Sequence, residues 1–88
     1  MTEARNRKRR YAVVLAEQMA EIPADTIHQL RLSLQEIGEA CEVVPPSSPF
    51  WFSVAGSDLV LDVAAWRFVY SIDRAAKKIT VKGHKPLR

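Results

Sequence analysis

The sequence has little of the chemistry that builds disulfides or metal sites. Cys41 is the one cysteine among the 88 residues, so an internal disulfide and a cysteine-rich zinc cluster are excluded. The two histidines, His28 and His84, lie far apart in the chain, which argues against a histidine metal site. A chain of this length also has no room for the paired βαβ units that bind dinucleotides. The sequence therefore predicts neither a metal nor any other cofactor.

Long apolar runs and a recognisable targeting segment are also missing. No apolar stretch reaches the ~20 residues that a membrane-spanning helix needs. The basic N-terminus is followed by a segment containing Glu17 and Glu21, which is not the pattern of a signal peptide. We therefore expect a cytoplasmic protein with no membrane partner.

Charge is what the sequence does have, and it is unevenly distributed. The composition is ordinary for one small globular domain, with 48% hydrophobic and 26% charged residues. The net charge of +3 combines +4 over residues 1–10, −7 over residues 11–73, and +6 over residues 74–88. Basic ends of this kind suit contact with a polyanion such as nucleic acid, and they equally suit solubility alone.

The N-terminal half predicts an arm, a strand and a helix. Residues 1–9 are polar without periodicity and predict a flexible arm, whereas residues 11–15 form an apolar, β-branched run typical of a strand. A helix is predicted from Asp25 to about residue 37, with Asp25 as its N-cap and Gly38 as the residue that ends it. An apolar stripe at spacings of three and four is formed by Ile27, Leu30, Leu34, Ile37 and Cys41.

The C-terminal half predicts mostly strands. Three prolines within residues 43–49 exclude a helix and a central strand there, and residues 50–52 predict either a short strand or an apolar plug. Residues 59–63, 66–72 and 78–82 predict strands, with a turn at residues 73–76. In the middle strand, the face expected in the core, and not as a base-stacking platform, carries Trp66, Phe68, Tyr70 and Ile72.

Together these elements predict an α+β fold. It consists of an N-terminal strand, one or two helices, and a three-stranded antiparallel meander, with the helices packed on one face of the sheet. We expect a single domain over residues 10–85, preceded by the arm of residues 1–9 and followed by a tail of residues 86–88.

Two motifs resemble the RelE/ParE superfamily, the bacterial toxins of toxin–antitoxin pairs. Residues 61–73 are similar to that family's pattern of Leu-Arg-Val-Gly-Asp-Tyr-Arg, two apolar residues, Tyr, any residue, Ile and Asp. Residues 79–85 are similar to its last strand followed by Gly-His-Arg. The resemblance extends over roughly residues 10–85, and the predicted opening strand and helix fit the same plan.

The resemblance implies two kinds of activity and one kind of partner. Members of the superfamily cleave messenger RNA, often on the ribosome, or inhibit DNA gyrase, and an antitoxin protein holds them. This sequence departs from the pattern at two places. Asp62 stands where the family usually has an arginine, and Arg88 is reached without the tyrosine that several ribonuclease members carry near the C-terminus. Both departures lower the expectation of ribonuclease activity.

The candidate catalytic residues for RNA cleavage are Arg67, His84 and Lys85. Cleavage without a metal needs a base, an acid and a cation at one phosphate. The guanidinium of Arg67 can bind two phosphate oxygens at once, and histidine titrates near neutral pH. Lys85 adds positive charge beside them. Further nucleic-acid contacts are expected from Lys78, Lys82 and Arg88.

Both central side chains also have a structural interpretation. Arg67 can be a surface arginine paired with Asp62 across a hairpin, and His84 can be a solvated histidine in a mobile tail. Three hypotheses about function therefore stay open. They are a toxin that cleaves mRNA, a non-catalytic binding protein of the same type, whether gyrase inhibitor or diverged non-toxic member, and a small basic protein that binds nucleic acid or the ribosome.

Overall fold

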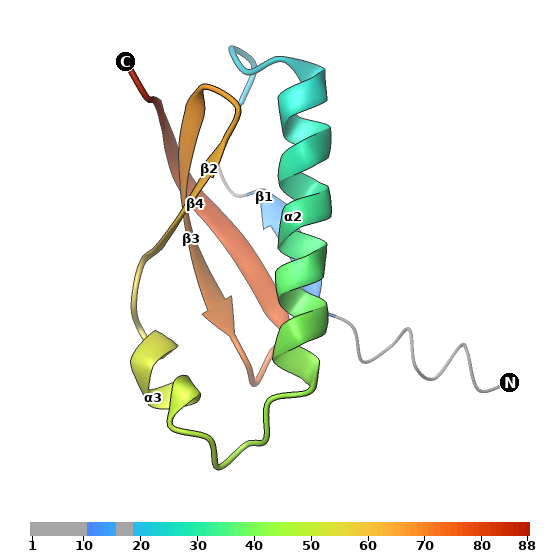
Figure 1. The fold of residues 1–88 in the computed structure, drawn as a ribbon, viewed down its shortest axis with the longest axis vertical. Helices are drawn as coiled ribbons and strands as arrows, with labels where there is room; N and C mark the ends of the chain where they lie inside the picture. Colours follow the sequence, from blue (N-terminus) through green and yellow to red (C-terminus); the bar gives the residue numbers. More distant parts are fainter. Residues whose placement is uncertain (1–10, 16–18) are drawn as a thin grey trace, which may run out of the picture.

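The structure, a computed structural model, describes residues 11–15 and 19–88, so the arm predicted for residues 1–9 lies outside the described residues. The elements, in chain order, are β1 (Ala12–Leu15), α2 (Ala24–Glu42), α3 (Phe50–Val54), β2 (Leu59–Val63), β3 (Trp66–Asp73) and β4 (Lys78–Pro86). The long helix α2 packs against one face of the sheet, and the short α3 lies near the end of β3 (Figure 1). Within the described ranges, no helix combines the length and the apolar character that crossing a membrane requires.

The sheet confirms the α+β class but is larger than the predicted meander. Its strand order is β1-β4-β3-β2, in which β2, β3 and β4 pair antiparallel as expected. The expected three-stranded antiparallel sheet is nevertheless wrong, because β1 joins as a fourth strand, parallel to β4. This pairing places Val13 beside Ile79 and Leu15 beside Val81, so apolar side chains from both chain ends meet on the face that α2 covers.

The core lies between α2 and this covered face of the sheet. Leu30 and Leu34, from the predicted stripe of α2, are fully buried. On the sheet, the fully buried side chains are those of Phe68, Ile79 and Val81. The alternation read from the sequence therefore identified the core face of β3 and β4 correctly, and the opposite face is called the open face below.

Both predicted ends of the helix are wrong. The residue that precedes α2 is Pro23, in an extended conformation, and Asp25 lies within the first turn and makes no cap hydrogen bond. A carboxylate there still favours the positive end of the helix dipole. Gly38 does not end the helix, which continues to Glu42. It is buried where α2 crosses Tyr11, and a Cβ added at Gly38 would lie 2.9 Å from the Cβ of Tyr11.

Residues 50–54 form the helix α3, so the alternative of a short strand is wrong. Pro49 precedes the helix, and the hydroxyl of Ser48 accepts a hydrogen bond from the backbone N–H of Phe50 at 3.2 Å. The indole N–H of Trp51 donates to the carbonyl of Pro45 at 2.9 Å, which ties the helix to the proline-rich connection. The side chain of Phe52 is 86% exposed, so this aromatic segment does not plug the core either.

Candidate functional site

Arg67 lies on the open face at the centre of the β2–β3 hairpin. Its Nε donates to Oδ1 of Asp62 at 2.8 Å and its Nη2 to Oδ2 at 3.0 Å, so the carboxylate holds the guanidinium at two points. These hydrogen bonds from Arg67 lower the pKa of the Asp62 carboxyl below its ordinary value. The pairing interpretation of Arg67 is therefore confirmed, and the donors that would grip a phosphate are occupied.

His84 lies on the covered face, not in a tail. It is part of β4, opposite the buried Phe68, and its ring centroid lies 5.7 Å from that of Trp66 and 6.5 Å from that of Phe68. Its Nε2 lies 2.8 Å from a carboxylate oxygen of Glu21, and only 7% of the side chain is exposed. The interpretation of a solvated histidine is therefore wrong, because this imidazole fastens the loop before α2 to the last strand.

The three candidate catalytic residues do not meet at one point. Lys85 pairs in register with Arg67, so these two side chains lie on the open face, while His84 lies on the other side of the sheet. A phosphodiester bound by Arg67 and Lys85 would have the sheet itself between its phosphate and the imidazole. The geometry therefore gives His84 no access to a reaction at that position.

The remaining basic residues of β4 also have acidic neighbours. Lys82 forms an ion pair with Asp58, which precedes β2, and Lys78 lies opposite Asp73 in register. Arg88 follows the strand and is exposed. On and beside the open face, four basic side chains thus stand against Asp58, Asp62 and Asp73, which leaves one net positive charge. The +6 of residues 74–88 is not what a ligand on this face would meet.

Valines separate the two ion pairs of the open face. Val60 of β2 pairs with Val69 of β3, and Val69 lies opposite Gly83 of β4. Val60 is 54% exposed, and Val14 of β1 is 37% exposed at the other edge. An apolar centre rimmed by charged groups is the arrangement found in protein–protein interfaces.

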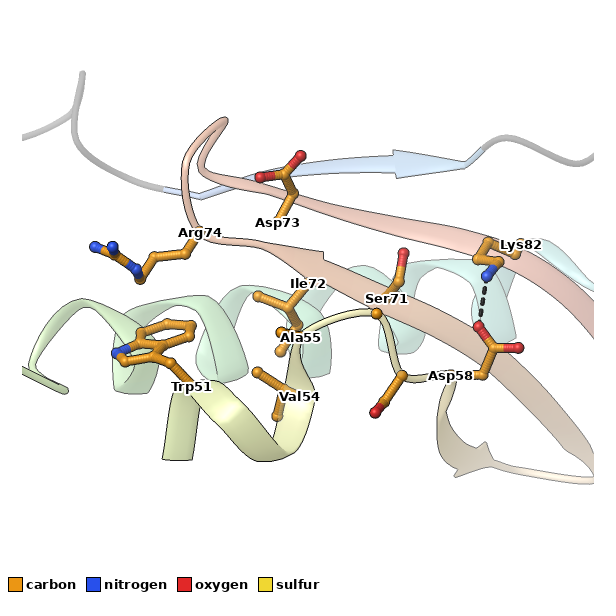
Figure 2. Close-up of a pocket in the computed structure, with 11 residues that line it drawn as sticks. Trp51, Val54, Ala55, Asp58, Ser71, Ile72, Asp73, Arg74 and Lys82 are labelled. Atoms are coloured by element: carbon orange, nitrogen blue, oxygen red, sulfur yellow. Dashed lines mark hydrogen bonds and ion pairs between the residues drawn. The ribbon is translucent and has the colours of Figure 1, made fainter. Parts of the chain in front are cut away.

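A cavity of about 440 Å³ beside β3 is a feature that sequence reasoning missed (Figure 2). Its lining comes from α3, from the segment before β2, and from the end of the β3–β4 hairpin, and consists of Trp51, Val54, Ala55, Gly56, Ser57, Asp58, Ser71, Ile72, Asp73, Arg74 and Lys82. The guanidinium carbon of Arg74 lies 5.6 Å from the centre of the Trp51 ring. One signal existed in the sequence, since the predicted third strand was longer than its predecessor and had to extend beyond it.

The residues do not form a metal site. No group of three or more His, Cys, Asp or Glu side chains within the described residues is arranged to hold a metal ion. Cys41 is buried against α2 and the sheet, and burial raises the pKa of its thiol. Comparison of the chain with protein-family models, with curated proteins and with solved structures found no match.

Proposed function

We propose that this chain is a non-catalytic binding protein of the RelE/ParE type. In this proposal it is the toxin component of a toxin–antitoxin pair, is held by an antitoxin protein, and acts on a protein target such as DNA gyrase through the open face of its sheet. The observation that carries the proposal is the separation of Arg67 and His84 onto opposite faces, each in contact with a carboxylate.

The resemblance supports the family part of this proposal through the placement of the two motifs. Residues 61–73 form most of the β2–β3 hairpin, and residues 79–85 lie in β4, its neighbour in the sheet. The motifs therefore belong to one continuous surface. Arg67, Val69 and Gly83, which come from both motifs, share the open face.

The chemistry supports binding over cleavage. A ribonuclease site needs its acid, base and phosphate anchor around one phosphodiester, and the sheet separates those candidates here. The exposed Val60 and the half-buried Val69, flanked by the Arg67–Asp62 and Lys82–Asp58 pairs, instead suit a protein surface of mixed character. Such charge pairs give an interface specificity more than raw affinity.

The proposal is tested by expressing matched variants and measuring growth arrest, together with supercoiling by purified gyrase. Val60→Glu places a charge at the centre of the open face, and Leu32→Glu does the same on α2, where Leu32 is 47% exposed. We expect Val60→Glu to abolish both effects and Leu32→Glu to retain them. Circular dichroism establishes that each variant is folded.

A second pair of measurements separates binding from cleavage. The double variant Arg67→Gln with His84→Gln removes both candidate groups for RNA chemistry, and we expect it to retain growth arrest if it remains folded. Purified wild-type protein is expected to leave translated mRNA intact. Cleavage of that mRNA by the wild type, lost in the folded double variant, would overturn the proposal in favour of a ribonuclease.

A further inference from the structure

The cavity beside β3 exists because β3 is longer than the strand that pairs with it. β2 pairs with β3 only from Trp66 to Tyr70, although β3 continues to Asp73. The chain before β2 does not follow β3 further. It turns at Gly56, whose φ of 69° is in the left-handed region that interrupts an extended strand. Residues 71–73 therefore form an edge of the sheet that faces the cavity.

This short edge has unused backbone hydrogen-bonding groups. In an antiparallel strand, the N–H and C=O of one residue point to the same side, and successive residues alternate. Either Ile72 or both of its neighbours must therefore direct a donor and an acceptor toward the cavity. Among the described residues, no backbone hydrogen bond joins residues 71–73 to the segment of residues 54–58. An unpaired edge of this kind is a template for another strand.

The two sides of the cavity differ in the way that the two faces of an added strand would require. Val54 and Ile72 face each other on one side, and Trp51 extends that apolar wall (Figure 2). On the other side lie the hydroxyl of Ser71 and the ion pair between Lys82 and Asp58. The volume of about 440 Å³ is within the range of ligand pockets. An extended segment would alternate apolar and polar side chains between these walls.

Arg74 supplies the charge at one end of the cavity. Arg67 and Lys82 each hold a carboxylate, whereas Arg74 makes no ion pair with any described residue. Its guanidinium lies over the ring of Trp51, as Figure 2 shows, and a ring contact of this kind leaves the planar fork of N–H donors able to bind a carboxylate. The complementary ligand group is therefore an acid.

We propose that this cavity binds an extended segment of a partner protein, which adds a short strand to the edge of β3 and places a carboxylate at Arg74. Backbone hydrogen bonds to residues 71–73 supply affinity, and the apolar wall with Arg74 supplies specificity. The site is separate from the Val60–Val69 centre of the open face, so it does not depend on the function proposed above.

The test is an NMR titration of the ¹⁵N-labelled full chain with three acetylated, amidated peptides. The probe Val-Ser-Val-Glu is expected to shift the amide resonances of residues 51–58 and 71–74 and to slow hydrogen exchange within residues 71–73. Val-Ser-Val-Gln lacks the carboxylate and is expected to bind about tenfold more weakly. Val-Pro-Val-Glu lacks a backbone donor and is expected to bind more weakly as well. Equal binding of all three peptides, or shifts outside the cavity, would overturn the proposal.

Matched variants assign the contact to Arg74 and the cavity. Arg74→Gln is expected to weaken the Glu peptide about tenfold and to leave the Gln peptide unchanged, and Arg31→Gln on the exposed side of α2 is the control. Ala55→Trp fills the cavity from an exposed position and is expected to abolish binding. Val60→Glu is expected to leave peptide binding intact, so the two proposals can fail separately. An Arg74→Gln protein that binds the Glu peptide as the wild type does would contradict this one.

Discussion

The two faces of one sheet follow different rules in this protein. The covered face is built from side chains such as Phe68, Ile79 and Val81, which are fully buried, and from one imidazole held between rings and a carboxylate. The open face is built from exposed valines and from basic side chains with acidic neighbours, such as Arg67 with Asp62. The difference teaches that adjacent residues of one motif can have unrelated roles, because alternation sends them to opposite faces.

The largest expected difference between the faces is in stability. Phe68→Ala on the covered face is expected to lower the free energy of unfolding by about 3–5 kcal/mol, because it leaves a cavity in the core. Val60→Ala on the open face is expected to lower it by less than about 1 kcal/mol. Urea unfolding followed by circular dichroism measures both. Similar losses for the two variants would mean that the open face is packed against something in solution.

Neighbouring residues of β4 provide the next comparison. His84→Ala removes a ring stack and the hydrogen bond to Glu21, so we expect it to cost about 1–2 kcal/mol of stability. Lys85→Ala, one residue further and on the open face, is expected to change stability by less than about 0.5 kcal/mol. Urea midpoints of the two purified variants decide the matter. A neutral His84→Ala would return His84 to the list of residues free to serve chemistry.

The tightest point of the covered face is the crossing of α2 and Tyr11 at Gly38. Alanine usually stabilises a helix interior by about 1 kcal/mol relative to glycine. Gly38→Ala is nevertheless expected to destabilise by about 1–2 kcal/mol, since its Cβ would lie 2.9 Å from that of Tyr11 and must push the strand away. Thermal unfolding measures the change, and Ala40→Gly, expected to cost about 1 kcal/mol, is the control. A Gly38→Ala protein more stable than the wild type would show that the helix and the strand are less closely packed.

Local patterns in the sequence predicted the elements better than their neighbours. Alternation identified the covered face of β3 and β4, and spacing identified the buried stripe of α2, because both signals are contained within one element. The parallel pairing of β1 with β4 joins residues at the two ends of the chain, and no local pattern encodes such a pairing. Gly38 failed as a helix end for the same reason, since the close approach of Tyr11 comes from tertiary packing.

The candidate site was limited by the same distinction. The pairing of Arg67 with Asp62 was foreseen as an alternative, since the two residues flank one predicted hairpin. The acids beside Lys78 and Lys82 were not foreseen, because they come from other segments of the chain, and a count of charge over residues 74–88 ignores them. The cavity beside β3 required the fold itself, since it is formed by a helix that was expected to be a strand or a plug.

The smallest expected effect lies on the open face and concerns the titration of Asp62. Hydrogen bonds from Arg67 lower the pKa of its carboxyl, so Arg67→Gln should raise that pKa toward its ordinary value. A group with a lowered pKa in the folded state stabilises the protein above its unfolded pKa. That contribution is lost as pH falls through the folded pKa, below about pH 4. It should be slight and weakened by salt, because both side chains are exposed.

The measurement is a ¹³C NMR titration of the Asp62 carboxyl in the wild type and in Arg67→Gln, each at low and high salt. We expect a lower pKa in the wild type and a smaller difference between the two proteins at high salt. Identical pKa values in both proteins would mean that Asp62 does not hold Arg67 in solution. The guanidinium would then be available to a phosphate, and the open face would carry more effective positive charge than its pairing allows. That result would revive a polyanion ligand for this face, so a small shift at one carboxylate separates the two accounts of how the face is used.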